Sequence, residues 1–237
     1  MELTELERLR VEKLERLRAR GIEPYPRLVK RTHTIAEASA ALEAAEGAGE
    51  EGPQVAVTGR LRSMRVMGKA TFAHIEDGSG SIQLFLRIQD VGEAAYETFK
   101  QDFDLGDFVG AEGALMRTRT GERSVLVKEV HMLAKAISPL PVIKEKEEDG
   151  RRVRYTEFSD VEERYRQRYA DLASNAEVRE IFRVRARTVN ALRRFFDEHD
   201  FLEVETPILQ PIYGGAAARP FVTFHNQLQQ DQYLRIS

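Results

Sequence analysis

The 237-residue sequence contains no cysteine and no tryptophan. The lack of cysteine excludes disulfides and thiolate metal sites, and it is typical of a protein from a reducing compartment. No apolar run approaches the roughly 20 residues that a membrane-spanning helix needs. The first residues, M-E-L-T-E-L-E-R, are charged and lack the apolar region of a signal peptide. We therefore expect a cytoplasmic protein that has no membrane partner.

A large excess of either charge is also absent, since the formal net charge is only -3. Charged residues make up 32% of the chain and apolar residues 42%, which favours a folded protein with a highly charged surface. The small net charge argues against a uniformly basic protein, but it leaves room for local basic patches that bind nucleic acid. At this length we expect one or two domains.

Residues 1–53 are predicted to form an N-terminal helical extension and a loop. Apolar residues recur at helical spacing from Leu3 to Leu17, with arginines and a lysine between them. The leucines indicate a helix that is docked on the rest of the protein, and a second interpretation is an arginine face that contacts RNA. The Ala-, Glu- and Gly-rich stretch 41–53 indicates the end of a helix that continues into a loop.

From Gln54 onward the apolar period changes to two residues, which predicts β-strands. The expected strands lie at 55–61, 70–75, 82–86, 108–116 and 125–130, with a helix at 92–104. The sequence D-G-S-G at 77–80 predicts a hairpin turn, because glycines accept a positive φ. Five short strands with a helix between the third and the fourth are typical of the oligonucleotide-binding (OB) barrel. We therefore assign an OB-fold barrel to residues 54–140.

Residues 141–173 are predicted to be a charged linker or hinge, because K-E-K-E-E-D-G-R-R-V-R contains few large apolar residues. A long helix with a capping box of Ser174 and Glu177 should follow, and then a strand in F-L-E-V-E-T-P at 201–207. Proline cannot donate a ladder hydrogen bond, so Pro207 places this strand end at an edge, a bulge or an interface. The chain is thus predicted to be α+β, with a second domain at 174–237.

The basic residues of the barrel are unevenly distributed. The stretch 60–69 carries four positive charges and no negative one, and the stretch 117–123 carries three against one. Such a face is suited to a phosphate backbone. Between these stretches Phe72 and His74 share one face of a strand, and Phe72 is either a platform for a base or a core residue. Gln83, across the hairpin, is either a base-reading amide or an ordinary surface residue.

We find no catalytic set and no metal-ligating set in the sequence. The five histidines lie far apart without metal-ligand spacing, and there is neither a P-loop nor a GxGxxG motif. Glu203 and Glu205 alternate along one strand and are interpreted as a solvated face rather than as an acid–base pair.

A series of short motifs runs along the chain from about Leu14 to Ser237. They are G-K-A-T-F (68–72), I-Q-L (82–84), D-L-G-D (104–107), T-G-E (120–122), L-P (140–141), R-Y-R-Q-R-Y-A-D-L (164–172), F-L-E-V-E-T-P-I-L (201–209), G-G-A-A-A-R-P-F (214–221) and Y-L-R-I-S (233–237). In this order and spacing they resemble the N-terminal half of the bacterial class II lysyl-tRNA synthetases. Aspartyl and asparaginyl synthetases share the barrel and the strand, but G-G-A-A-A-R-P-F favours lysine.

The resemblance implies that the barrel binds the anticodon of tRNA(Lys). In this family an aromatic residue stacks on the central uridine, and a Gln, an Arg and a Glu read nearby bases. These roles fall on Phe72, Gln83, Arg65 and Glu122.

The resemblance also implies roles for the second domain, which would begin the antiparallel-sheet catalytic domain. The strand that ends at Pro207 would belong to motif 1, through which these enzymes form homodimers. Gly215 and Ala216 would line the pocket for the substrate lysine, where small residues let the backbone approach closely.

The complete enzyme is expected to activate lysine with ATP and Mg²⁺ and then to esterify it to the tRNA. Motifs 2 and 3, which hold the ATP and Mg²⁺ ligands, are expected beyond Ser237, so the 237 residues alone are predicted to bind neither cofactor and to be inactive. Two other functions stay open: a stand-alone tRNA- or single-strand-binding protein without catalysis, and a dimerisation fragment that inhibits the full-length enzyme.

Overall fold

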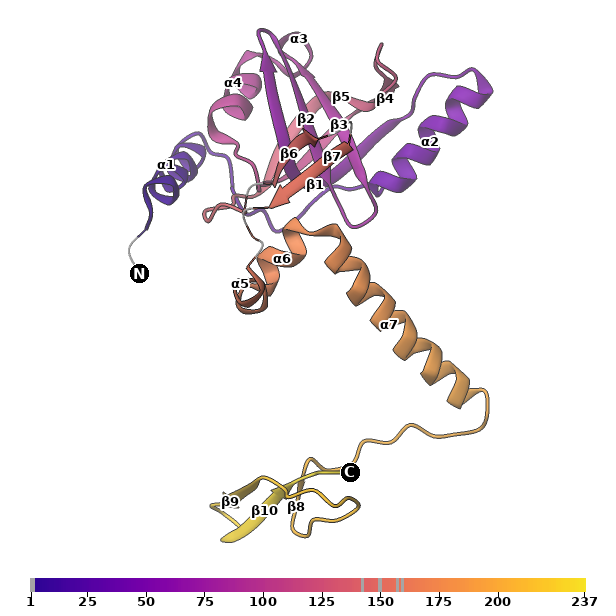
Figure 1. Cartoon of the computed structure of the whole chain (residues 1–237). Helices are drawn as coiled ribbons and strands as arrows, with labels where there is room; N and C mark the ends of the chain where they lie inside the picture. The colour runs from indigo at the N-terminus through magenta and orange to yellow at the C-terminus, as the bar shows by residue number, and fades with distance from the viewer. Residues whose placement is uncertain (1–2, 142, 149–150, 157, 159) are drawn as a thin grey trace. The chain divides into compact units, whose positions relative to one another are not determined.

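Figure 1 shows the computed structural model of the chain, which describes residues 3–141, 143–148, 151–156, 158 and 160–237. The protein is of mixed α+β class and consists of two compact units, Met1–Ser174 and Asn175–Ser237. Within the described residues, no helix combines the length and the apolar character that crossing a membrane requires.

Five strands of the first unit close into a barrel in the order β1-β2-β3-β5-β4. Their bounds are β1 Gln54–Met67, β2 Ala70–Glu76, β3 Ser81–Arg87, β4 Phe108–Arg117 and β5 Arg123–Ala134. All neighbouring pairs are antiparallel except β3 and β5, which are parallel. The helices α3 (Ile88–Val91) and α4 (Glu93–Asp102) connect β3 to β4. The predicted OB-fold barrel is therefore confirmed, with strands longer than the sequence pattern indicated.

Alternation along the strands sends every second side chain into the core of the barrel. Ile75 on β2 and Leu84 and Leu86 on β3 are 0% exposed. Burial of each such side chain contributes about 1.5–3 kcal/mol relative to an exposed one. The barrel also requires glycine at one close approach, because a Cβ at Gly113 would lie 2.0 Å from the carbonyl oxygen of Leu126.

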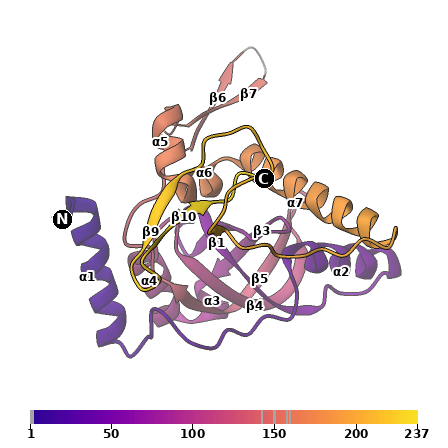
Figure 2. The same ribbon diagram turned by 90° about the horizontal axis from the view of Figure 1, so that it is seen from below.

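The helices α1 (Glu5–Ala19) and α2 (Ile35–Ala48) lie on opposite sides of the barrel (Figures 1 and 2). Each begins with a capping box, in which a threonine and the glutamate three residues later bond reciprocally to the backbone. Ile35 and Leu42 of α2 belong to the same buried cluster as the barrel core. The N-terminal residues therefore pack on the barrel and help to form its core.

Charged side chains attach α1 to the barrel together with leucines. Leu14 and Leu17 are buried. The carboxylate of Asp102, at the end of α4, accepts hydrogen bonds from Arg16 and Arg20, both at 2.8 Å. These two arginines therefore help to hold the end of α1 against α4, which agrees with the docked helix, and the alternative of an RNA-contacting arginine face stays open.

A buried lysine holds the loop that follows α4. The Lys135 side chain is 0% exposed, and its Nζ lies 2.6 Å from a carboxylate oxygen of Asp104 and 2.8 Å from one of Asp107. Lys13 of α1 also pairs with Asp104 at 2.6 Å. Burial raises the pKa of Asp104, but the hydrogen bonds from the two lysines outweigh burial, and the pKa is lowered overall.

The D-G-S-G turn joins β2 to β3 as predicted, but the predicted reason is wrong, since neither Gly78 nor Gly80 has a positive φ. Instead, the Asp77 carboxylate accepts from the backbone N–H groups of Ser79 (2.7 Å), Gly80 (2.9 Å) and Ile35 (2.9 Å). Burial raises the pKa of Asp77, but the hydrogen bonds outweigh it and lower the pKa overall. One carboxylate thus fixes both the turn and the start of α2.

The segment 141–173, predicted as a charged linker or hinge, contains regular structure. Its elements are β6 (Ile143–Glu148), β7 (Arg151–Thr156), α5 (Val161–Arg166) and α6 (Arg168–Ser174). The strands β6 and β7 form an antiparallel hairpin whose register places Glu147 opposite Arg152. The segment predicted as a linker therefore includes paired strands.

The second unit begins with α7 (Ala176–Asp197), the long helix that the apolar spacing predicted. The predicted capping box is wrong, because Ser174 is still the last residue of α6 and the N-cap of α7 is Asn175, whose side chain makes no capping hydrogen bond. After the helix, Asp200 adopts a φ of 62° and turns the chain, as the sequence indicated.

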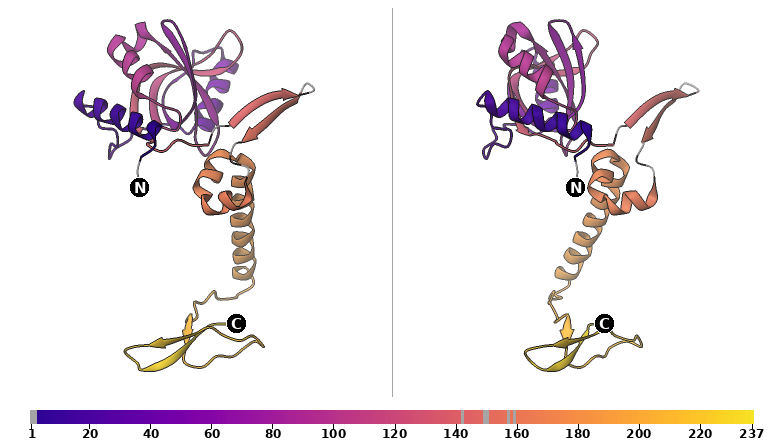
Figure 3. Two further views of the ribbon diagram at one scale, coloured as in Figure 1. Left: turned by 60° about the vertical axis from the view of Figure 1, so that its left-hand side comes forward. Right: turned by 90° about the vertical axis from the view of Figure 1, so that its left-hand side faces the viewer.

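The predicted strand at 201–207 is also wrong, because these residues are irregular in the structure. A strand needs a neighbour to accept and donate its backbone hydrogen bonds, and none of the described strands pairs with this segment. Pairing starts only after Pro207, at β8 (Leu209–Gln210). The strands β8, β9 (Val222–His225) and β10 (Gln230–Leu234) form a small sheet in the order β8-β10-β9 (Figure 3).

Candidate nucleic-acid interface

The outer face of β2 carries the aromatic residue that the sequence singled out. Ala73 and Ile75 point into the core and are 0% exposed, whereas Phe72 and His74 are only partly buried. The alternative that Phe72 is a core residue is therefore wrong.

Phe72 belongs to a row of side chains that crosses the sheet. The register places Phe72 opposite Arg65 of β1 and opposite Phe85 of β3. The rings of Phe72 and Phe85 are stacked, with centroids 4.7 Å apart and an interplanar angle of 3°. The guanidinium carbon of Arg87 lies 5.6 Å from the centroid of Phe85. The row therefore presents two parallel aromatic rings beside Arg65, and Arg87, two residues further along β3, lies near the second ring.

A second, polar row lies beside the aromatic one. The register aligns Ser63 of β1, His74 of β2, Gln83 of β3 and Ser124 of β5. Gln83 is only 6% exposed, and its side-chain oxygen accepts a hydrogen bond from the Ser124 hydroxyl at 2.8 Å. The alternative that Gln83 is an ordinary surface residue is therefore wrong.

Glu122 reaches this polar row from the turn between β4 and β5. Gly121, with a φ of 85°, forms that turn, and the backbone N–H of Glu122 donates to Thr118 Oγ1 at 3.0 Å. One carboxylate oxygen of Glu122 lies 2.6 Å from His74 Nε2, and the other accepts from Gln83 Nε2 at 2.6 Å. Glu122 thus joins Gln83 in one hydrogen-bond network, although the two residues lie 39 positions apart in the sequence.

The two rows and the turn form a groove of about 850 Å³. Its lining residues are Ser63, Met64, Arg65, Phe72, His74, Gln83, Phe85, Arg87, Met116, Thr118, Arg119, Thr120 and Glu122. All four residues to which the resemblance assigned anticodon contacts lie in this one groove. Phe85 was not singled out in the sequence, although I-Q-L-F-L-R alternates and places Phe85 on the same face as Gln83.

The positive charge of the groove is smaller than the sequence suggested. Arg117 and Arg123 pair with Glu46 and Glu43 of α2, at 2.8 and 2.9 Å. The hydrogen bond from Arg117 lowers the pKa of the Glu46 carboxyl. In the part of the chain that the structure describes, two arginines of the groove, Arg65 and Arg119, form no ion pair with a carboxylate. No neighbouring carboxylate of the described residues therefore neutralises the charge of these two side chains.

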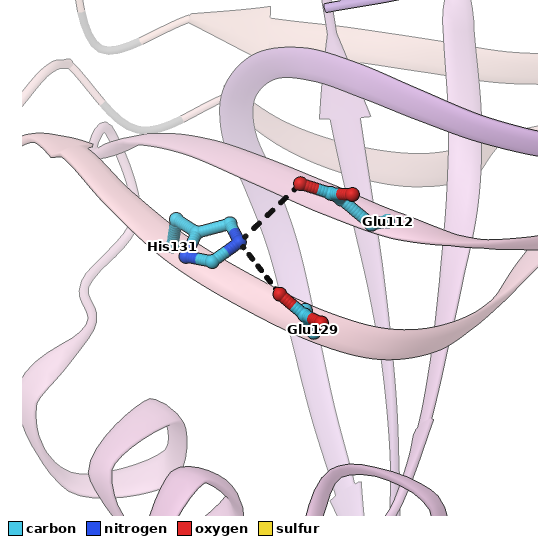
Figure 4. A group of neighbouring side chains, drawn as sticks. All are labelled: Glu112, Glu129 and His131. Carbon is cyan, nitrogen blue, oxygen red and sulfur yellow. Dashed lines mark ion pairs between the residues drawn. The ribbon is translucent and has the colours of Figure 1, made fainter. Parts of the chain in front are cut away.

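One group of side chains has atoms close enough together to share a metal ion, among the residues that are described. Glu112 of β4 and Glu129 and His131 of β5 lie on neighbouring strands outside the groove, with their ligand atoms within 4.8 Å of one another (Figure 4). His131 Nε2 lies 3.7 Å from Glu112 and 3.5 Å from Glu129. Lys30 also pairs with Glu112, so one of the two carboxylates already has a lysine as its partner.

The predicted residues of the second unit lie in or near the small sheet. Gly215 and Ala216 are exposed and belong to the connection between β8 and β9. Gly215 has a φ of 91°, and a Cβ there would lie 2.7 Å from the Cβ of Ser237, so this position requires glycine. Pro207 is exposed and directly precedes the sheet.

Two family models match the chain, and they cover different parts of it. The first is described as "OB-fold nucleic acid binding domain" and matches residues 55–133. The second is described as "tRNA synthetases class II (D, K and N)" and matches residues 160–237. The first match coincides with the barrel, and the second includes the whole of the second unit.

Curated proteins named lysine–tRNA ligase are similar to the whole chain. The protein from Roseiflexus sp. (strain RS-1) is 51% identical over 100% of this chain and 46% of its own length. The protein from Roseiflexus castenholzii is 52% identical, and that from Chloroflexus aurantiacus is 50% identical, with the same coverage. The chain thus spans less than half the length of these relatives, and it corresponds to their N-terminal part.

Proposed function

Since this chain belongs to the lysine–tRNA ligase family and corresponds to the N-terminal part of its members, we propose that its barrel binds the anticodon of tRNA(Lys). The complete protein would activate lysine with ATP and transfer it to that tRNA. The observation that carries the proposal is the convergence of Arg65, Phe72, Gln83 and Glu122 in one groove of the OB-fold barrel.

The groove has the parts that a single-stranded loop needs. An unpaired base can stack on the partly exposed ring of Phe72, which is worth about 1–3 kcal/mol per base. The Glu122 side chain is 45% exposed, so its carboxylate can accept hydrogen bonds from the edge of a neighbouring base. Arg65 would read a nearby base, as the resemblance implies, and Arg119 would bind the phosphates that connect these bases.

The second unit would contribute to lysine binding and to dimerisation. We assign Gly215 and Ala216 to the lysine pocket, and the positive φ of Gly215 supports a backbone that approaches its ligand closely. We assign Pro207 to a homodimer interface. The exposure of large apolar side chains nearby supports this assignment: Leu202 is 90% exposed and Phe195 on α7 is 53% exposed.

ATP and Mg²⁺ belong to the proposal for the complete protein. Within the described residues of the second unit, no three His, Asp or Glu side chains lie close enough together to share an ion. These residues therefore do not fit an Mg²⁺ site, and we derive no step of lysine activation from them. A cytoplasmic location is part of the same proposal.

The proposal can be tested with three RNAs of equal length: the anticodon stem-loop of tRNA(Lys), the same stem with a changed loop, and a fully paired hairpin. Binding is measured by fluorescence anisotropy at two salt concentrations. We expect the tRNA(Lys) loop to bind most tightly, with weaker binding at higher salt. Equal affinity for both loops would support the alternative of a general single-strand-binding protein, and the absence of binding would refute the proposal.

A further inference from the structure

His74 takes part in the polar row of the groove but has no assigned role. Its Nδ1 lies 2.9 Å from the Ser63 hydroxyl and its Nε2 lies 2.6 Å from Glu122. Both ring nitrogens thus have a partner, and the partners lie on opposite sides of the ring. Two such contacts fix the orientation of the imidazole.

The chemistry of the partners determines the direction of these hydrogen bonds. An ionised carboxylate only accepts hydrogen bonds, so His74 Nε2 must be protonated, and its N–H donates a hydrogen bond to Glu122. In the neutral ring Nδ1 then accepts from the Ser63 hydroxyl. Gln83 donates to the other carboxylate oxygen at 2.6 Å. The Glu122 carboxylate is therefore held by one donor on each of its two oxygens.

This arrangement changes which side chain is available to a ligand. Gln83 is only 6% exposed, and both ends of its amide are bonded, to Ser124 and to Glu122. Glu122 is 45% exposed and still has an unused lone pair on each oxygen. Glu122 is thus the acceptor that faces the groove, whereas Gln83 mainly supports it.

We propose that His74 is a positioning residue that fixes the Glu122 carboxylate, so that the groove selects a base with an N–H donor at the centre of its pairing edge. Uracil has such a donor at N3, whereas cytosine has an acceptor there, so a fixed carboxylate accepts from uracil and repels cytosine. This inference rests on the proposed function, since it requires that a loop of RNA binds in the groove.

The test uses the 237-residue chain with His74→Ala, His74→Gln and Glu122→Gln. Glutamine is the matched control for alanine, because its amide N–H can replace the donor at Nε2. The RNAs are the tRNA(Lys) anticodon stem-loop and three versions in which one anticodon uridine is replaced by cytidine. The measured quantity is the ratio of the dissociation constants for cytidine and uridine at each position.

For the unchanged chain we expect a preference for uridine of about tenfold at one position at least. His74→Ala should reduce this preference to about twofold or less, and His74→Gln should keep most of it. Adding His74→Ala to Glu122→Gln should change the ratio no further, because His74 acts through Glu122.

A residue that only braces the barrel would affect all four RNAs equally, so an unchanged ratio in His74→Ala would overturn the inference. Melting temperatures identify variants that fail to fold. If His74→Ala fails to fold, Ser63→Ala provides the second test. We expect this variant to lose less of the preference for uridine over cytidine. An unchanged chain that binds no loop would contradict the proposed function itself, whereas one that binds the uridine and cytidine loops equally would overturn the inference.

Discussion

Replacement of Phe72 by alanine separates binding from stability. The loss of a stacked base should weaken RNA binding by about 1–3 kcal/mol, which is about 5- to 150-fold in the dissociation constant. The effect on folding should be smaller, because Phe72 is not in the core. The change removes the stacking on Phe85 at 4.7 Å, which is worth about 0.5–1.5 kcal/mol beyond area burial.

The assay measures both quantities for each variant: anisotropy of a labelled tRNA(Lys) anticodon stem-loop, and thermal unfolding followed by circular dichroism. Phe108→Ala is the matched control, because Phe108 is a 40% exposed aromatic residue of the same barrel outside the groove. It contacts Arg60, at 4.5 Å, so its loss should lower stability slightly and leave RNA affinity unchanged. A Phe72→Ala variant that loses several kcal/mol of stability but binds RNA normally would refute the reasoning.

Three further predictions concern the rest of the chain. Asp77→Ala should destabilise the first unit by about 1–2 kcal/mol in denaturant titrations, because the start of α2 loses its acceptor. Folding lowers the pKa of Asp77. The ionised Asp77 carboxylate therefore stabilises the folded chain above the ordinary pKa of aspartate, about 3.9, and this stabilisation is lost as the pH falls through the lowered folded value. The loss of stability in acid should accordingly be less steep in Asp77→Asn. Lys135→Met should cost about 3–5 kcal/mol, because Asp104 and Asp107 lose their buried cation; an unchanged unfolding midpoint would contradict this. Finally, the 237 residues alone should show no lysine-dependent ATP–pyrophosphate exchange, and detectable exchange would be inconsistent with our assignment of ATP and Mg²⁺ to the remainder of the protein.

The barrel could be predicted from the sequence because it depends on local patterns. Alternation in T-F-A-H-I placed Phe72 and His74 on one face, since strand side chains alternate whatever their neighbours are. Only the closed barrel shows that this face is the outer one, because Ala73 and Ile75 fill the core. The same alternation places Phe85 on the face of Gln83, although the sequence analysis did not single out Phe85.

The polar network of the groove could not be predicted in the same way. Ser124 lies beside Gln83 because β3 and β5 pair in parallel, and the sequence contains no local sign of that pairing. Glu122 was assigned through the resemblance alone. Its contacts with His74 and Gln83 depend on a turn that follows another strand, so they are a property of the fold.

The errors also have physical causes. The segment 201–207 alternates like a strand, but alternation does not supply a neighbouring strand for hydrogen bonding. The prediction that segment 141–173 is a charged linker or hinge stays a prediction. Its described residues include the paired strands β6 and β7, which the composition did not indicate.

The central claim is that Phe72 stacks on the central uridine of the anticodon. The most direct measurement combines Phe72→Ala with a stem-loop in which that uridine is replaced by an abasic site. We predict that each change alone weakens binding by about 1–3 kcal/mol and that both together weaken it no more than one alone, because they remove the same contact. Losses that simply add would contradict the claim.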